Sequence, residues 1–306
     1  GALIASSDNK SLYVLRGYGN TDFWKYSTTY LSSGSFTSTA LDSGGNLEYG
    51  KLNWGVTVPM QIQGISPQTN GLVSYWRMDE ASGATTVADS KGTNTGTISG
   101  ATPGVAGRSG NAISFDGVDD NVALPSGFSD FTNGFSVEAW ANFTSNNGWE
   151  TIVDLGNGND INLIRFGRYY SNADIGLYTA ESNWLWASGS IINNEWHHYA
   201  ATIDASGNRK IYKDGVQIAS GAGSVPANIT RTKNYIGRSD YANNFFKGDV
   251  DEVAIYNRAL SAEEIYAHYV VKFQLAASAD NSVWTDFVGP DGTVNSYFAV
   301  SGTDIP

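Results

Sequence analysis

The sequence predicts an all-β protein built as a sandwich of antiparallel sheets. The chain of 306 residues contains 35 Gly, 13% aromatic residues and only 16% charged residues, which is typical of many short strands joined by turns. Apolar and polar residues alternate with a period of two in several stretches, as strands with one buried face require. Only one segment has a convincing helical pattern, so helices contribute little to the predicted fold.

Two stretches show the strand pattern clearly, and an Asp-Gly pair marks a hairpin. In 135–143, Phe135, Val137 and Ala139 point to one face, and residues 271–277 alternate in the same way. Asp214-Gly215 separates the stretches 210–213 and 216–219, which we expect to pair as a hairpin. This pair favours positive φ angles, so the sequence predicts a type I′ turn there.

The one predicted helix begins after Ser261. Ser261 and Glu264 have the spacing of a capping box, and Ala262, Ile265 and Tyr269 follow at helical intervals. We expect a helix of about two turns, docked on the edge of the sandwich.

The order of the segments predicts two nested domains. Residues 1–69 and 270–306 are expected to form one β-sandwich module, which the block 70–269 interrupts, because neither flank alone could bury a core. Three sequential units are the alternative. An incomplete flanking module would expose strand edges that could pair with a neighbouring chain.

Charge and composition exclude several function classes. The chain has 30 acidic and 18 basic residues, which gives a net charge of −12. This charge argues against binding of nucleic acid or of anionic membranes. Without Cys there is no disulfide, thiolate nucleophile or Cys-ligated zinc. His197 and His198 are neighbours on a predicted strand and cannot share one metal, so we expect one in the core and one at the surface. His268 is expected to be solvated or to pack on the sheet.

A series of motifs in order gives the block 71–269 a family resemblance. They are GLVSYWRMDE at 71–80, VADSKG at 87–92, GRSGNAISFDG at 107–117, DDNV at 119–122, FSVEAW at 135–140, EWHHY at 195–199, IYKDG at 211–215 and GDVDEVAIYNRALSAEEI at 248–265. Together they resemble the laminin-G-like, concanavalin-A-like jelly-roll domains of bacteria and archaea. The flanks resemble, more loosely, a small β-sandwich module of exported surface proteins, and we expect the chain to be part of a longer protein.

The resemblance implies two antiparallel sheets packed face to face, in a scaffold that binds glycans or proteins. Glucanases of this superfamily use two glutamates on one face of a strand. Here Asp249 and Asp251 share a face while Glu252 is expected to point the other way, so glycoside hydrolysis is not expected. The resemblance also implies a structural calcium ion, held by Asp79, the Gly110 carbonyl and Asp251, with Asp116 in reserve. Alternatively, Asp251 caps loop amides and Asp116 serves a turn.

Aromatic residues between 149 and 186 are the strongest indication of a binding surface. Trp184 and Trp186 are two residues apart and face the same way on a strand, as stacking on a sugar or contact with a protein requires. Sandwich cores also bury such residues, so we expect at least half of the group to be core and two or three to line a concave face. The candidate ligand-binding residues are Trp149, Tyr169, Tyr170, Tyr178, Trp184 and Trp186, with Arg168 and Asn183 as hydrogen-bonding neighbours.

The sequence therefore predicts a non-catalytic module that binds carbohydrate or protein, in an adhesion protein outside the cell or on its surface. Its expected partners are polysaccharides or the glycans of glycoproteins. The alternative is a structural subunit of a surface filament or layer, assembled by strand pairing between copies of the chain.

Overall fold

The computed structural model describes residues 67, 69–145, 148–158, 161–170, 172–180, 183–240 and 244–275, and the strand segments 3–5, 11–15, 23–27, 35–36, 56–57, 60–63 and 298–300. The chain divides into two compact units, Gly1–Gly64 with Val270–Pro306, and Ile65–Tyr269. Each unit is described by itself.

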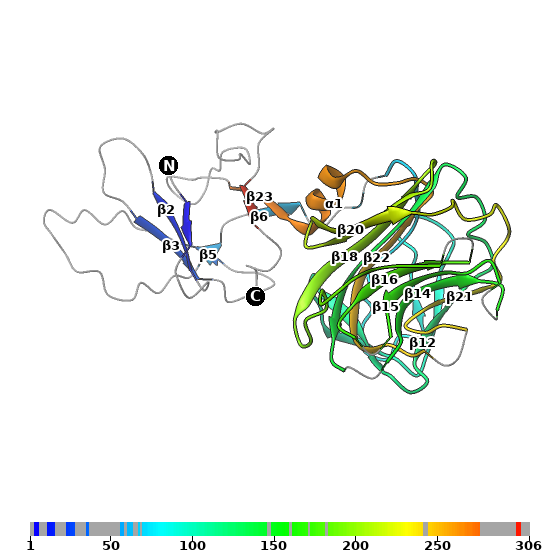
Figure 1. Ribbon diagram of the computed structural model, residues 1–306. Helices are drawn as coiled ribbons and strands as arrows, with labels where there is room; N and C mark the ends of the chain where they lie inside the picture. Colours follow the sequence, from blue (N-terminus) through cyan, green and yellow to red (C-terminus); the bar gives the residue numbers. More distant parts are fainter. Residues whose placement is uncertain are drawn as a thin grey trace, which may run out of the picture. The chain divides into compact units, whose positions relative to one another are not determined.

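The unit Ile65–Tyr269 is a sandwich of two antiparallel eight-stranded sheets, as predicted (Figure 1). Sheet 1 has the order β10-β11-β22-β13-β18-β19-β20, and β7 pairs with β22. Its strands are β7 Leu72–Trp76, β10 Thr102–Ala106, β11 Asn111–Asp116, β13 Gly134–Phe143, β18 Trp196–Asp204, β19 Asn208–Lys213, β20 Val216–Ala222 and β22 Lys247–Tyr256.

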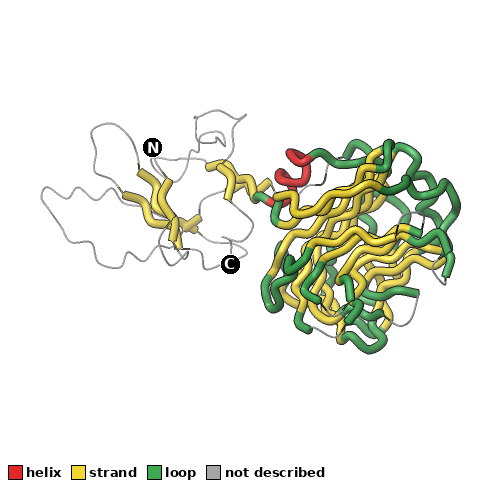
Figure 2. Tube along the Cα trace, in the orientation of Figure 1, coloured by secondary structure: helices red, strands yellow, loops and turns green. Residues whose placement is uncertain are grey.

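Sheet 2 has the order β17-β16-β15-β14-β21-β12-β9-β8. Its strands are β8 Thr86–Val87, β9 Gly96–Ser99, β12 Asn121–Leu124, β14 Glu150–Gly156, β15 Ile164–Arg168, β16 Ile175–Thr179, β17 Asn183–Ala187 and β21 Lys233–Ile236. Figure 2 shows how far strands dominate this unit, in which the helix α1 (Ala262–Tyr269) stands out.

The inner faces of both sheets form one apolar core. The predicted alternation on β13 is confirmed, because Phe135, Val137 and Ala139 are fully buried in that core. Phe166 of β15 and Leu177 of β16 enter it from sheet 2. Every second residue of these strands is thereby committed to the core.

The predicted turn and helix are also confirmed. Asp214 and Gly215 have φ angles of 52° and 76°, the left-handed values of a type I′ turn, and they join β19 to β20. At the start of α1 the Glu264 backbone N–H donates to Ser261 Oγ at 3.2 Å. In return, the Ser261 N–H donates to the Glu264 carboxylate at 2.8 Å, which completes the capping box.

Helix α1 covers part of the outer face of sheet 1 through a second, smaller core. Ile265 of the helix packs there with Tyr212, Ala254, Tyr256 and Leu260. This contact leaves that part of the sheet out of reach of solvent.

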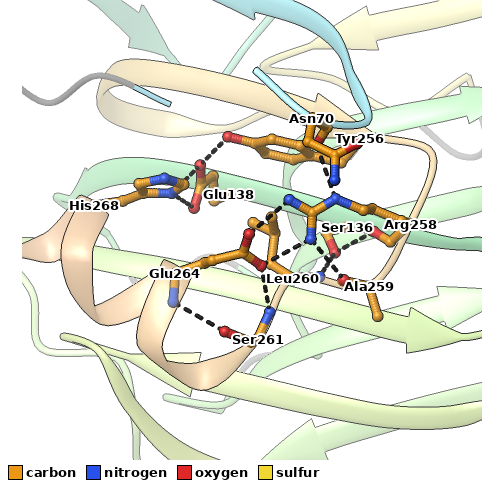
Figure 3. A network of polar contacts seen from close by, with 10 residues as sticks. All are labelled: Asn70, Ser136, Glu138, Tyr256, Arg258, Ala259, Leu260, Ser261, Glu264 and His268. Atoms are coloured by element: carbon orange, nitrogen blue, oxygen red, sulfur yellow. Dashed lines mark hydrogen bonds and ion pairs between the residues drawn. The ribbon is translucent and has the colours of Figure 1, made fainter. Parts of the chain in front are cut away.

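A buried polar network joins the helix to the sheet beside this second core (Figure 3). Glu138 on β13 accepts a hydrogen bond from the Tyr256 hydroxyl at 3.0 Å, and its carboxylate lies 2.8 Å from His268 Nδ1 on the helix. His198 of β18 contacts the same carboxylate. The two histidines hold the pKa of Glu138 well below its usual value, against the opposing effect of burial.

The segment before the helix belongs to the same network. The Arg258 guanidinium donates to both carboxylate oxygens of Glu264 and to the carbonyl of Asn70, at the start of the unit. Ser136 on β13 donates to the Arg258 carbonyl and accepts from the Leu260 N–H. The first and last segments of the unit are therefore linked through one arginine.

A β-bulge in β22 corrects one expectation. Val250 and Val253 both lie in the main core, and the register with β13 shifts between Glu138 and Trp140. The two residues between the valines, Asp251 and Glu252, therefore both point away from the core, and Glu252 has a φ of 53°. The prediction that Glu252 points to the opposite face from Asp251 is wrong because strict alternation fails at this bulge.

The histidines differ in part from expectation. His197 and His198 are both buried, and each contacts carboxylates: His197 Nδ1 lies 2.7 Å from Asp214, and His198 faces Glu138. Neither is at the surface, and each buried imidazole has a polar partner, Asp214 in the turn between β19 and β20 for His197 and Glu138 on β13 for His198. Of the two predictions for His268, solvation or packing on the sheet, the second is confirmed, because His268 is buried against Glu138 of β13.

The unit of the two flanks contains short strands in three sheets. These are β1 Leu3–Ala5, β2 Ser11–Leu15 and β3 Phe23–Ser27; β4 Ser35–Phe36 and β5 Val56–Thr57; and β6 Met60–Gln63, β23 Val271–Leu275 and β24 Phe298–Val300. Because β23 pairs with β6, the segments before and after the larger unit share a sheet. Most of the predicted flanking sandwich lies outside the described residues and stays a prediction. In the described part of the chain, no helix has the length and apolar character needed to cross a membrane.

We predict that Glu138→Gln destabilises the protein by about 3 kcal/mol at pH 7, because it leaves His268 and His198 without their buried anion. The folded pKa of Glu138 lies below its unfolded value, so its ionised form stabilises the fold at neutral pH. That contribution is lost as the pH falls below 4.5. Urea denaturation at pH 7 and pH 3 should show a smaller acid sensitivity in the variant than in the wild type. Glu263→Gln, at an exposed position of the same helix, is the control and should change stability little.

Candidate functional site

Six aromatic side chains of the larger unit form one continuous cluster. Trp184 lies at its centre, with ring centroids 5.2 Å from Trp149, 5.1 Å from Tyr169 and 5.4 Å from Tyr178. Trp186 stacks on Tyr169 at 4.7 Å, with the two planes 13° apart. The aromatic cluster consists of Trp149, Tyr169, Tyr170, Tyr178, Trp184 and Trp186.

Strand alternation places the cluster on the outer face of sheet 2. Leu177 of β16 and Leu185 of β17 point into the core, so Tyr178, Trp184 and Trp186 point outward. The remaining three rings come from the turn before β14 and from the two residues that follow β15. The two strands β16 and β17, the turn before β14 and the residues after β15 thus come together at the edge of the sheet, which β17 forms.

A glycine makes the close packing possible. A Cβ atom at Gly176 would lie 2.8 Å from the Trp184 ring, so the indole lies directly over the β16 backbone. The ring thereby packs closely on the β16 backbone, although its own strand is at the edge of the sheet. Such fixed rings lose little conformational entropy when a ligand stacks on them.

All six residues are at least partly exposed, and Tyr170 and Trp186 expose 56% and 45% of their surface. The expectation that at least half of them are core residues is wrong. The core of this end of the sandwich is filled by Leu177, Leu185 and Ile175 instead. Whether the cluster binds a ligand stays a prediction.

A single cross-strand row continues from the cluster across the outer face. Successive register partners are Trp184 on β17, Tyr178 on β16, Arg165 on β15, Asp154 on β14 and Tyr235 on β21. Neighbouring strands are about 4.8 Å apart, so these four steps span about 19 Å. We call these five residues the cross-strand row.

The middle of the row is a buried ion pair. Arg165 Nε lies 3.3 Å from Asp154 Oδ2, and both side chains are almost inaccessible to solvent. Burial raises the pKa of Asp154 to about 6, against the attraction of Arg165 and a hydrogen bond with Ser239. Ser239 belongs to the loop between β21 and β22, so this loop lies close to the outer face at that point.

Arg168 has a structural role, which corrects its place among the predicted ligand-binding residues. It is fully buried and forms an ion pair with Glu150, and its guanidinium donates to the carbonyls of Asn172 and Ser145. On β15 it points inward, over the ring of Phe143. The side chain of the other polar candidate, Asn183, lies outside the described residues.

Three of the four predicted metal ligands lie together. A side chain at Gly110 would come within 2.2 Å of Asp79 Oδ1, and one at Gly107 would come within 2.8 Å of Asp251 Oδ2. The loop that contains both glycines therefore lies in close contact with both carboxylates. Burial, and the nearby charge of Asp79, raise the pKa of Asp251 to about 8.

The three groups are all oxygen donors, and two of them already accept backbone hydrogen bonds: the Gly110 carbonyl from the Gly107 N–H at 3.0 Å and Asp79 Oδ1 from the Asn111 N–H at 3.1 Å. Asp251 Oδ2 accepts a hydrogen bond from the Ser109 N–H, whereas its buried Oδ1 has no hydrogen bond within the described residues. Two carboxylates and a loop carbonyl are the oxygen ligands that Ca²⁺ prefers. These residues could hold the ion, with Arg77, which pairs with Asp79 at 2.9 Å, as a competing cation.

Asp116 does not belong to this set. It ends β11 opposite Lys247, four residues from Asp251 along β22 and so about 13 Å away. Its carboxylate accepts hydrogen bonds from the backbone N–H groups of Val118 and Asp119. This agrees with the alternative prediction that Asp116 serves a turn. Asp116, Asp119 and Asp120 come within 4.8 Å of one another there, which by itself is common for exposed acidic groups.

Two of the acidic residues of β22, Asp251 and Glu252, are buried. The Tyr75 hydroxyl of β7 donates to Glu252, and burial raises the pKa of Glu252 to about 8. Asp251 is likewise fully buried. Both carboxylates belong to the sheet opposite the aromatic cluster.

Sequence reasoning missed Asp154, Tyr235 and Arg238 on the outer face of sheet 2. The register of β14 with β21 brings Asp154 beside Tyr235, and Arg238, which follows β21, lies over the Tyr235 ring. The period-two pattern on β21 could have indicated that Tyr235 points outward, but not which strand lies beside it.

Comparison with known proteins agrees with the fold. Residues 116–266 match the family described as the concanavalin A-like lectin/glucanases superfamily, which confirms the predicted resemblance. No curated protein matches the sequence.

Solved structures resemble this chain at low identity. Domain 4 of an extracellular arabinanase from Geobacillus stearothermophilus, in complex with arabinotriose, is 23% identical with a TM-score of 0.48. The match covers 64% of this chain and 97% of that one. Trypanosoma rangeli sialidase is 20% identical with a TM-score of 0.50, over 70% of this chain and 33% of the sialidase. The binding domain of botulinum neurotoxin serotype D/C is 14% identical with a TM-score of 0.48, over 64% and 51% of the two chains.

If Arg168 is structural, Arg168→Met should destabilise the protein by about 3 kcal/mol, because Glu150 is left as an unpaired buried charge. The double variant Arg168→Met/Glu150→Met removes both charges and should recover part of that loss. Urea denaturation of the wild type, both single variants and the double variant gives the interaction free energy between Arg168 and Glu150. Additive effects of the two substitutions would contradict the assignment.

Proposed function

We propose, from the membership of residues 116–266 in the concanavalin A-like lectin/glucanases superfamily, that the unit Ile65–Tyr269 is a carbohydrate-binding module. The observation that carries this proposal is the aromatic cluster. It exposes large rings on the outer face of one sheet, although the core beneath them is complete without them.

The chemistry of the cluster suits sugar rings. The apolar faces of a pyranose stack on indole and phenol rings, and Tyr and Trp add a polar group at the edge. Trp186 and Tyr170 offer the most exposed surface, and Trp184 is fixed against Gly176. A rigid, half-exposed aromatic surface favours saturable binding of a polysaccharide chain over a deep pocket for a small molecule.

We further propose that the module is not an enzyme. Glycoside hydrolysis generally needs two carboxyl groups on either side of the scissile bond. In the cross-strand row Asp154 is the one carboxylate, and it is paired with Arg165. Asp251 and Glu252 are buried on the other sheet. These positions favour binding without hydrolysis.

An exported or cell-surface protein is the setting that we propose for this module. Polysaccharides and glycoprotein glycans are encountered outside the cell, and the net charge of −12 favours solubility there. A cell-surface protein that binds such glycans through this surface would attach its cell to them, which is the adhesion role that we propose.

We predict that Trp184→Ala and Trp186→Ala each weaken glycan binding by about 2 kcal/mol, or roughly thirtyfold in Kd, as loss of an aromatic anchor does. Ligands are first found on a glycan array, and the Kd of the best ligand is then measured by calorimetry. Tyr266→Ala is the matched control, since Tyr266 exposes 51% of its surface on α1, on the other sheet. Unchanged affinity in both tryptophan variants, with folded protein, would contradict the proposed site.

We also propose that Asp79, the Gly110 carbonyl and Asp251 hold a structural calcium ion. Added Ca²⁺ should then raise the melting temperature, and 100 times its Kd should add about 2.7 kcal/mol of stability. Asp251→Asn and Asp79→Asn should each abolish this increase, whereas Asp116→Asn should retain it. Calorimetric scans with Ca²⁺ or with EDTA measure the difference. An equal response in the Asp116 and Asp251 variants would refute the site.

A further inference from the structure

We propose that the ligand of this surface is an acidic polysaccharide, and that Arg238, assisted by Lys233, binds a sugar carboxylate at the far end of the cross-strand row. This inference rests on the proposed carbohydrate-binding function and specifies its substrate class. It comes from two cations on the outer face of sheet 2, beyond the buried pair of Arg165 and Asp154.

Arg238 is fixed above the last residue of the row. Its guanidinium carbon lies 4.6 Å from the centre of the Tyr235 ring and 5.7 Å from that of Phe245. Tyr235 is the register partner of Asp154, so Arg238 lies on the same outer face. Two rings hold the planar head in place, which lowers the entropy lost when a ligand binds it.

The head of Arg238 is only weakly bonded within the protein. Its contact with Asp240, at 3.5 Å, is long for a charge-assisted hydrogen bond, and its buried Nε has no hydrogen bond within the described residues. The side chain keeps 28% of its surface exposed. By contrast, Arg165 and Arg168 on β15 have buried carboxylate partners. An external anion would therefore reach the exposed end of the guanidinium rather than the buried Nε.

Lys233 adds a second cation on the same face. On β21, Asn234 and Ile236 are buried, so the exposed Lys233 points outward with Tyr235. The register partner of Lys233 on β14 is Gly156, which has no side chain that could cover the ammonium group. A carboxylate bound by Arg238 would thus have a second positive charge one side-chain repeat away, about 7 Å along the strand.

A sugar carboxylate accounts for this arrangement better than a neutral sugar. The planar guanidinium fits a carboxylate with two parallel hydrogen bonds, a geometry that a hydroxyl does not use. The chain as a whole carries a charge of −12, so its overall field repels polyanions. An acidic chain would be bound only where the aromatic cluster and these cations occur together, which gives selectivity.

The test compares uronic-acid polymers with their own neutral forms. Oligosaccharides of polygalacturonate, alginate and hyaluronan are each used with intact carboxylates and after reduction of the carboxylates to alcohols. Calorimetry at low ionic strength measures the Kd for wild type, Arg238→Gln, Lys233→Gln, Trp184→Ala and Lys91→Gln. Lys91 is exposed in the loop between β8 and β9 and gives the same change in charge as the Lys233 variant.

The wild type should bind at least one acidic form about tenfold more tightly than its reduced form. Arg238→Gln should abolish this preference and Lys233→Gln should reduce it, while Lys91→Gln keeps it. Trp184→Ala should weaken binding of both forms. Salt should weaken only the binding of the acidic forms.

Equal affinity of the wild type for acidic and reduced forms would overturn the acidic-ligand inference, while the carbohydrate-binding function stands. A preference that survives Arg238→Gln would overturn the assignment of Arg238. Binding to sulfated but not to carboxylated glycans on the glycan array would likewise reject the carboxylate as the ligand group. If none of these probes binds while neutral glycans from the array do, only the inference fails; if no glycan binds, the proposed function fails with it.

Discussion

Burial of the two inner sheet faces in one apolar core determines the direction of every regular side chain in the larger unit. Because Phe166, Leu177 and Leu185 must reach that core, their strand neighbours must face outward. A slip of one residue would exchange the two sets, so the core also fixes the register of the outer faces. The aromatic cluster and the cross-strand row therefore depend on packing that lies on the other side of the same strands.

The two outer faces use that constraint in different ways. On sheet 1, α1 covers part of the outer face, and polar groups there are satisfied inside the protein, as the contacts of Glu138 with His268 and Tyr256 show. A helix can be added there because Ile265 supplies an apolar contact. On sheet 2, outward rings at the β17 edge remain accessible to solvent. The rings of the aromatic cluster are therefore exposed on a face that α1 does not cover.

The fold could be predicted from the sequence because its signals are local. The alternation on β13, the Asp-Gly turn at 214–215 and the capping box at Ser261 each depend on neighbouring residues, and all three are present. The burial of Arg168 and the shared face of Asp251 and Glu252 could not be predicted in the same way. The first depends on a partner strand that supplies Glu150, and the second on a bulge that interrupts the alternation. The six aromatic residues were found because they cluster in sequence, but their exposure depends on which other residues fill the core.

The position of charge on sheet 2 follows from the same geometry. Asp154 and Arg165 are register partners on the neighbouring strands β14 and β15, and their charges neutralise one another. The middle of the row therefore presents little net charge. Arg238 stands one strand further, above Tyr235, with Asp240 only loosely in contact. The row thus changes from aromatic at the β17 edge, through a neutral pair, to Tyr235 on β21, where Arg238 lies above the ring with Asp240 beside it. A ligand lying across the strands would meet these three environments in sequence, whereas a ligand lying along one strand would not.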